Sequence, residues 1–237
     1  IIERTRRPSG LARFLPPLRL AYLDSFHSHR VQTLHAVLEN ESWMPMPVST
    51  DFAELLIPFG FKAAGDGGFI APSGRNFRQL SASALMALKF VHEYIQFASC
   101  LTDAAAETFR RLYTLLEEYN ARAYKSSTVG KARVVQGKSL ALLIATLDFL
   151  TELTQTLHTK LSLISTPQQA NALMQQLDRI TIQLRDHRGQ ILNRFVVQLR
   201  EIGNKCLESI LSGRDGQESL TTFAKKLGSL QRTLREH

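Results

Sequence analysis

Cysteine is scarce in this chain: its 237 residues include only two, Cys100 and Cys206, which lie far apart. Two thiols are too few for the disulfide framework that stabilises small secreted domains. Neither has a second cysteine or a histidine nearby at the spacing that metal ligands require. We therefore expect a protein of a reducing compartment that holds no metal and no cofactor.

Catalytic motifs are missing or incomplete. The sequence contains no G-x-S-x-G nucleophile motif. Gly137-Lys138-Ser139 matches the end of a Walker A loop, but Ala132 stands where that motif needs its first glycine. His92-Glu93 matches the start of a zinc-protease helix, but Gln96 replaces the second histidine ligand. The chain is therefore predicted not to be an enzyme.

Acidic residues are absent between Asn120 and Ser139. This segment, which we call the basic connector, carries five cations: Arg122, Lys125, Lys131, Arg133 and Lys138. The chain's formal net charge of +8 adds to the bias and favours acidic partners such as anionic lipids, nucleic acid or acidic protein subunits. We predict that the basic connector meets an acidic partner or an anionic membrane surface. A nucleic-acid-binding module stays an alternative that we do not favour, because aromatic residues do not interleave with the cations.

Long apolar runs are also lacking. No uninterrupted run approaches the roughly 18 residues of a membrane-spanning helix, and no signal peptide precedes the first predicted helix. The first residue is Ile1 rather than methionine, so we interpret the sequence as a section of a longer protein.

Helical periodicity dominates what is present. The clearest pattern begins at Thr166-Pro167, where Thr166 and Gln169 are the residue types of a capping box. Apolar residues then recur at steps of three and four, at Leu173, Leu177, Ile180, Leu184, Ile191, Phe195, Leu199, Ile202, Cys206 and Ile210. A helix over 166–211 spans about 65 to 70 Å. We therefore predict an all-α fold, an elongated multi-helix bundle of the helical-rod type.

Other segments show the same periodicity. Helices are predicted over residues 18–40, 50–56, 81–101, 103–123 and 139–164, and from 219 onward. Ser126, Ser127, Gly130 and Gly137 are expected to break the helical pattern inside the basic connector.

The glycine-rich residues 60–80 are interpreted as a mobile surface loop, with Phe69-Ile70 as a short strand. The chain is expected to divide into three parts. These are a basic linker over 1–17, an N-terminal helix with a Pro/Gly-rich loop over 18–80, and a C-terminal helical bundle over 81–237.

His187 continues the seven-residue repeat of Leu173 and Ile180, so it falls on the apolar stripe of the longest predicted helix. The first interpretation is a core histidine that is hydrogen-bonded across the bundle. The second is a contact to another subunit, made together with the neighbouring Asp186 and Arg188. Replacing His187 with leucine separates the two, because only the first interpretation predicts a loss of folding.

Four segments together resemble one known family. They are the stretch from Phe26 to Phe52, the helix around Leu88 to Phe97, the segment from Val129 to Leu142, and the run from Leu184 to Ile191 that contains Asp186-His187-Arg188. In this order and spacing they are similar to the carboxy-terminal domain of the vacuolar protein sorting-associated protein 54 family, from about residue 26 onward. The related protein syndetin stays an alternative.

The resemblance implies a non-enzymatic module of a multisubunit vesicle-tethering complex, the Golgi-associated retrograde protein complex. Such a complex captures endosome-derived vesicles at the trans-Golgi network. The implied partners are the other subunits, SNAREs and small GTPases reached through the whole complex, and an anionic membrane surface. The implied location is cytoplasmic and peripheral on trans-Golgi and endosomal membranes. A syndetin-type protein would instead belong to the endosome-associated recycling complex.

Overall fold

The computed structural model describes residues 10–64, 68–129, 137–164 and 167–212, together with the single positions 221, 224, 225 and 228. Its α-helices are α1 (Gly10–Glu39), α2 (Thr50–Leu56), α3 (Ala82–Cys100), α4 (Ala105–Val129), α5 (Gly137–Ile164) and α6 (Pro167–Leu211). Short 3-10 turns, η1 (Ile57–Phe59) and η2 (Thr102–Ala104), follow α2 and α3. The predicted all-α, elongated bundle is confirmed.

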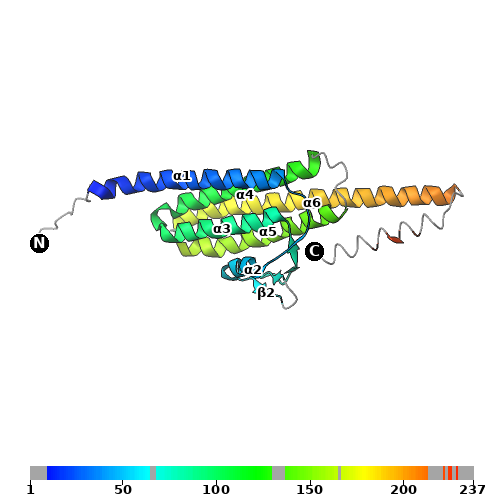
Figure 1. The fold of residues 1–237 in the computed structure, drawn as a ribbon, viewed down its shortest axis with the longest axis horizontal. Coiled ribbons are helices and arrows are strands. Elements are labelled where there is room, and N and C mark those ends of the chain that lie inside the picture. The colour runs from blue at the N-terminus through cyan, green and yellow to red at the C-terminus, as the bar shows by residue number, and fades with distance from the viewer. Residues whose placement is uncertain are drawn as a thin grey trace, which may run out of the picture.

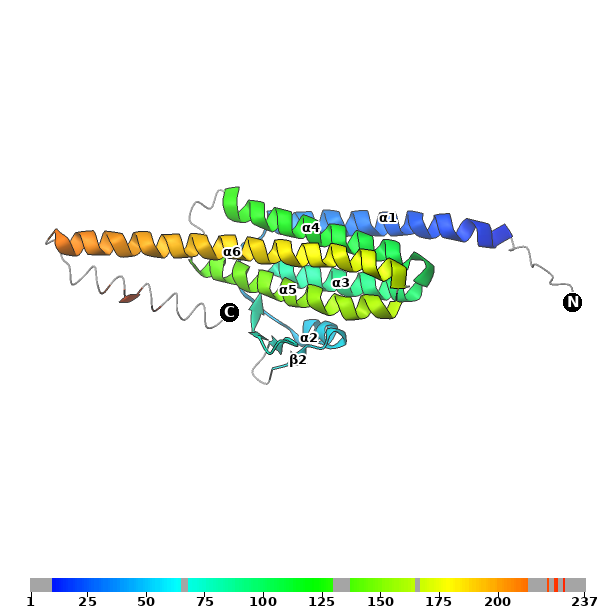
Figure 2. The ribbon, with the colours of Figure 1, turned by 180° about the vertical axis from the view of Figure 1, so that it is seen from behind.

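The long helices α1, α3, α4, α5 and α6 lie side by side along one axis (Figure 1). The views from both sides show α1 and α6 extending past the bundle at opposite ends (Figure 2). Their apolar stripes meet in one core, which includes Leu147 and Leu157 of α5 together with Leu177 and Ile180 of α6. The hydroxyl of Thr181 donates to Thr154 at 3.1 Å, so the polar residue in the α5 repeat is satisfied from α6.

The longest helix begins and ends where the sequence predicts. Pro167 is the first residue of α6 and Leu211 is the last. Proline is favoured at this position because its missing N–H has no partner in the first turn of a helix. The helix predicted from 219 onward falls almost entirely outside the described residues.

Two helix boundaries differ from the predictions by more than two residues. Helix α1 begins at Gly10 rather than at residue 18 and contains Pro16 and Pro17. The fixed φ of proline is itself helical, so a helix can continue through it at the cost of a backbone hydrogen bond. Helix α4 continues through Ser126 to Val129, and the Ser126 hydroxyl donates to the Ala123 carbonyl at 2.9 Å. This bond to a carbonyl of the preceding turn satisfies the hydroxyl inside the helix, so the serine does not end α4.

Residues 60–64 and 68–80, the described part of the glycine-rich range, form short paired strands, so the interpretation of this part as a mobile surface loop is wrong. Strands β2 (Lys62–Ala63), β3 (Phe69–Ile70) and β4 (Asn76–Phe77) pair antiparallel into a small meander. A separate pair joins β1 (Met46–Pro47) to β5 (Gln79–Leu80). The strand at Phe69–Ile70 is confirmed.

Aromatic packing explains why the meander is ordered. The rings of Phe61, Phe69 and Phe77 surround Phe149 of α5, with centroids 6.1, 5.5 and 5.8 Å from its ring. All four side chains are at most 5% exposed. Gly68 has a φ of +87°, and an added Cβ would lie 2.3 Å from the Phe77 carbonyl oxygen, so only glycine fits there.

One helix in the described part of the chain is long and apolar enough to cross a membrane, which corrects the prediction that none is. The section Ser139–Leu161 of α5 has a mean hydropathy of 1.3. Of the 18-residue apolar stretch within this section, 78% is buried inside the bundle. A core helix surrounded by other helices has the same composition, so this section is weak evidence for a membrane span.

Candidate partner-binding cleft between α4 and α6

The structure describes only part of the basic connector. Arg122 lies on α4 and pairs with Glu39 of α1 at 3.3 Å and with Glu118 of its own helix at 3.6 Å. Lys125 is exposed on the same helix. Lys131 and Arg133 lie outside the described residues, as does the side chain of Lys138 in the first turn of α5. The charge of Arg122 is therefore balanced by two carboxylates. One of them, Glu39, lies 83 residues earlier in the chain.

His187 joins α6 to α4. It is only 3% exposed, and its Nδ1 lies 2.7 Å from Oδ1 of Asn120. The ring of Tyr124, one turn further along α4, stands nearly perpendicular to the imidazole at a centroid distance of 4.7 Å. The predicted burial and the predicted hydrogen bond across the bundle are both present.

The environment of His187 keeps it neutral at physiological pH. Burial lowers the pKa of its imidazole from 6.5 to about 4, and the nearby charge of Arg194 contributes in the same direction. The Asn120 oxygen accepts, so Nδ1 carries the proton and Nε2 is left as an acceptor. This Nε2 atom is buried and has no hydrogen-bond partner among the described residues.

A cleft of about 360 Å³ opens beside His187. Its walls come from α4 and α6, and they consist of Glu117, Asn120, Ala121, Tyr124, Gln183, Asp186, His187 and Gln190. The lining contains two carboxylates and no lysine or arginine. A cleft of this charge suits a cation or a hydrogen-bond donor rather than an acidic group.

Asp186, His187 and Arg188, which were predicted to act together, do not all lie on the same side of α6. Asp186 and His187 line the cleft, whereas Arg188 extends to Asp148 of α5, with Nε 2.6 Å from Oδ1. The same Oδ1 atom lies 2.8 Å from Nη1 of Arg75, in the turn between β3 and β4. Asp148 therefore links the meander, α5 and α6, and Arg188 is held within this clamp.

The cleft residues on α4 were not foreseen. Glu117, Asn120 and Tyr124 each follow a buried position by one residue, so their pattern is that of an ordinary helix flank. The buried positions are Leu116, Tyr119 and Ala123. Spacing along α4 places Glu117, Asn120 and Tyr124 on one face, but nothing in the sequence indicates that His187 faces them.

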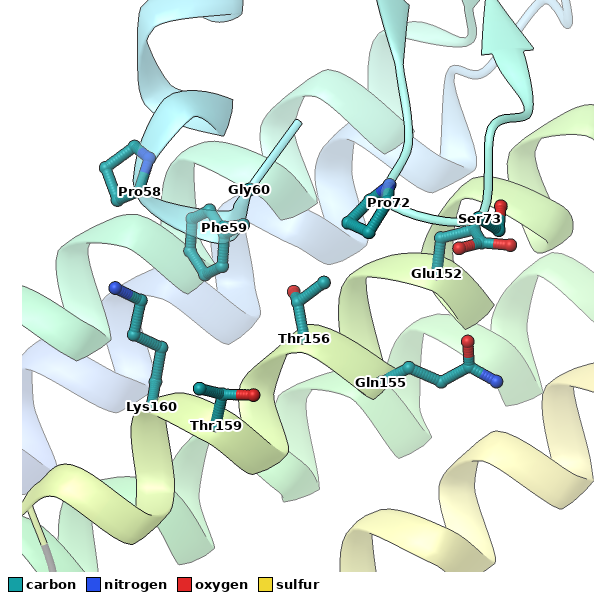
Figure 3. Close-up of a pocket in the computed structure, with 10 residues that line it drawn as sticks. All are labelled: Pro58, Phe59, Gly60, Pro72, Ser73, Glu152, Gln155, Thr156, Thr159 and Lys160. Carbon is teal, nitrogen blue, oxygen red and sulfur yellow. The ribbon is translucent and has the colours of Figure 1, made fainter. Parts of the chain in front are cut away.

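A second hollow of about 590 Å³ lies between α5 and two neighbouring segments, η1 and the turn between β3 and β4 (Figure 3). Pro58, Phe59, Gly60, Pro72 and Ser73 lie on one side of it, and Glu152, Gln155, Thr156, Thr159 and Lys160 of α5 lie on the other. The side chains in Figure 3 converge on no single point, and the lining contains both charges. Among the described residues, no group of three or more histidine, cysteine, aspartate or glutamate side chains is placed to hold a metal.

Comparisons with known proteins agree with the sequence resemblance. A family model described as Vps54-like protein matches residues 77–201. Vacuolar protein sorting-associated protein 54 of Rattus norvegicus is 21% identical over 221 residues, which cover 85% of this chain and 23% of the rat protein. The chain thus spans about a quarter of that relative's length, and no solved structure matches it. Because the family model covers more than half of the sequence, this chain belongs to the Vps54-like protein family.

Proposed function

We propose that this chain is a non-enzymatic, partner-binding module of a multisubunit vesicle-tethering complex. The observation that carries the proposal is the family match over residues 77–201, which extend from β4 through most of α6. The match to the rat protein, which covers 85% of the chain, supports the same class. That relative is named for vacuolar protein sorting. The whole complex, rather than this module alone, would hold a vesicle at its target membrane.

The finer role we propose is retrograde transport from endosomes to the trans-Golgi network. In this role the chain acts on the cytoplasmic face of these membranes with the other tether subunits, and it reaches SNAREs and small GTPases through the complex. Its physical form is consistent with such work, because five long helices packed along one axis make a stiff rod. Such a rod presents surfaces for contact at fixed distances from one another.

Two alternatives are less well supported. The first is a syndetin-type subunit of the endosome-associated recycling complex, but the family match is to the Vps54-like protein model. A nucleic-acid-binding module needs free cations on one face. Many described arginines are instead engaged with carboxylates, namely Arg19, Arg30, Arg75, Arg110, Arg111, Arg122 and Arg188.

Affinity capture of the full-length protein from cells, followed by quantitative mass spectrometry, tests the proposal. We expect the other tether subunits at near-stoichiometric amounts, and immunofluorescence should place the protein on trans-Golgi and endosomal membranes. Recovery of syndetin-complex subunits alone would assign the alternative complex. Capture without any tether subunit would refute the proposed class.

A further inference from the structure

The cleft between α4 and α6 brings together two exposed carboxylates and a buried hydrogen-bond acceptor, Nε2 of His187. Glu117 and Asp186 are exposed at its rim, on facing helices, and neither forms an ion pair with a described residue. Most described carboxylates on the neighbouring helices are engaged by a basic group, for example Glu39, Glu107 and Glu118. In a chain with a net charge of +8, two such carboxylates on the lining of one cleft form a local negative site, with the guanidinium of Arg194 as the nearby cation over the Tyr124 ring.

The buried atom is Nε2 of His187. The imidazole is 97% buried against α4, it forms part of the cleft wall, and its Nδ1–H is already donated to Asn120. Nε2 is left as an acceptor without a protein donor. Buried polar atoms in native proteins nearly always have a partner. Six buried side-chain atoms lack a hydrogen-bond partner among the described residues, and Nε2 of His187 is the one that belongs to a residue lining this cleft.

The chemistry of the lining selects the class of that donor. An anionic group, such as a lipid phosphate, would face two carboxylates and no cation on the lining. A guanidinium or ammonium group would pair with the carboxylates and would also supply the missing donor. The ring of Tyr124 offers a surface for a cation, and Arg194 already lies 5.7 Å from its centroid.

We infer that the α4–α6 cleft receives an arginine or lysine side chain from a basic segment of a partner protein. The volume of 360 Å³ lies near the lower end of the range for ligand pockets, as expected for one long side chain rather than a large metabolite. Glu117 and Asp186 pair with its charge, and Gln183 and Gln190 also line the cleft. This inference rests on the proposed partner-binding function and names the chemistry of the partner.

Fluorescence anisotropy with the full chain tests the inference. The probe is a fluorescein-labelled twelve-residue peptide of alanine and glutamine that carries three arginines four residues apart; citrulline replaces arginine in the control peptide. The test variant combines Glu117→Gln with Asp186→Asn. The matched control combines Glu201→Gln with Glu208→Gln, which removes the same charge from exposed positions of α6 outside the cleft.

We expect the arginine peptide to bind the unmodified chain and the Glu201/Glu208 variant equally, and the cleft variant at least about tenfold more weakly. A second measurement follows the imidazole itself: the ¹⁵N resonance of His187 Nε2 should move towards that of a hydrogen-bonded acceptor when the peptide binds. All the substituted carboxylates are exposed, so the melting temperature should stay unchanged in each variant.

Equal binding by the cleft variant and the control variant would overturn the inference, because charge alone would then explain the affinity. Equal affinity for the citrulline peptide, or an unmoved Nε2 resonance, would also overturn it. Recovery of the tether subunits with the full-length protein is independent of this assay. A negative result in the peptide assay therefore leaves the proposed membership of the tethering complex untouched. A negative result in the capture experiment would instead contradict the proposed function itself.

Discussion

The two sides of the bundle differ in how their aromatic rings pack and in how their carboxylates are paired. Where the meander meets α5, four phenylalanine rings are buried against one another, and Asp148 forms ion pairs with both Arg75 and Arg188. Where α4 meets α6, Nε2 of His187 is buried and the carboxylates of Glu117 and Asp186 are exposed, and none of these groups has a partner among the described residues. The first side is organised for stability, and the second retains unsatisfied groups of the kind found at binding sites.

The largest expected effect lies on the meander side. Phe149→Ala removes the ring that Phe61, Phe69 and Phe77 surround, and it should lower the free energy of unfolding by about 3 to 5 kcal/mol. Urea denaturation followed by circular dichroism measures this change. Phe14→Ala is the control, because Phe14 is 73% exposed and should change stability by less than about 0.5 kcal/mol. Similar values for both variants would mean that the meander does not stabilise the bundle.

The second effect concerns the pH dependence that His187 imposes. Its folded pKa is about 4 against 6.5 for an ordinary histidine, so the unfolded state binds the proton more readily. The stability from the neutral ring is complete above pH 6.5 and is lost as the pH falls towards 4, in total by about 3 kcal/mol. Denaturation at several pH values should show a flatter profile for His187→Phe. Parallel profiles for the two proteins would contradict the burial of a neutral imidazole.

Substitution of His187 with leucine also separates its two roles. Loss of the hydrogen bond to Asn120 should leave that amide oxygen unpaired and lower the melting temperature, as a structural histidine requires. If melting is unchanged while the arginine peptide no longer binds, His187 acts only through the cleft.

The clamp at Asp148 should have a smaller effect. Asp148→Asn removes the charge that holds Arg75 and Arg188, and we expect a loss of about 1 to 2 kcal/mol because both arginines are partly exposed. Asp178→Asn is the matched control, since its pairing with His158 lies at a carboxylate that is 64% exposed. A cost for Asp148→Asn no greater than for Asp178→Asn would show that the clamp contributes nothing.

The smallest effect is a gain. Gly189 lies in the middle of α6, and an added Cβ would meet no atom within 4 Å. Gly189→Ala should therefore stabilise the protein by about 0.5 to 1 kcal/mol, because alanine loses less backbone entropy in a helix. A rise of the urea midpoint checks this. A fall would indicate that α6 needs the glycine for a bend, as at other helix kinks.

Periodicity was sufficient to predict the helices but not the parts that depend on distant residues. The α6 stripe and its Pro167 start are local signals, and both are present in the structure. The meander could not be predicted, because its phenylalanines are ordered by Phe149, which is 72 residues beyond Phe77. The start of α1 was missed because two prolines outweighed the helical pattern around them.

The sequence predicted the α6 residues of the candidate site but not its α4 residues. The heptad position of His187 placed it inside the bundle, and Asp186 beside it lines the cleft. Glu117, Asn120 and Tyr124 were missed, because the facing of α4 and α6 depends on how the helices pack and not on either sequence alone. The lack of acidic residues between Asn120 and Ser139 was misleading for Arg122, because Glu39 of α1 reaches it from elsewhere in the chain.

Carboxyl footprinting by mass spectrometry tests the contact surface most directly. Glu117, Asp186, Glu201 and Glu208 would be labelled in the free full-length protein and again in the membrane-bound tethering complex. We predict that Glu117 and Asp186 lose most of their labelling in the complex, while Glu201 and Glu208 keep theirs. Equal labelling of Glu117 and Asp186 in both states would contradict the assignment of the α4–α6 cleft as the surface through which this bundle binds its partner.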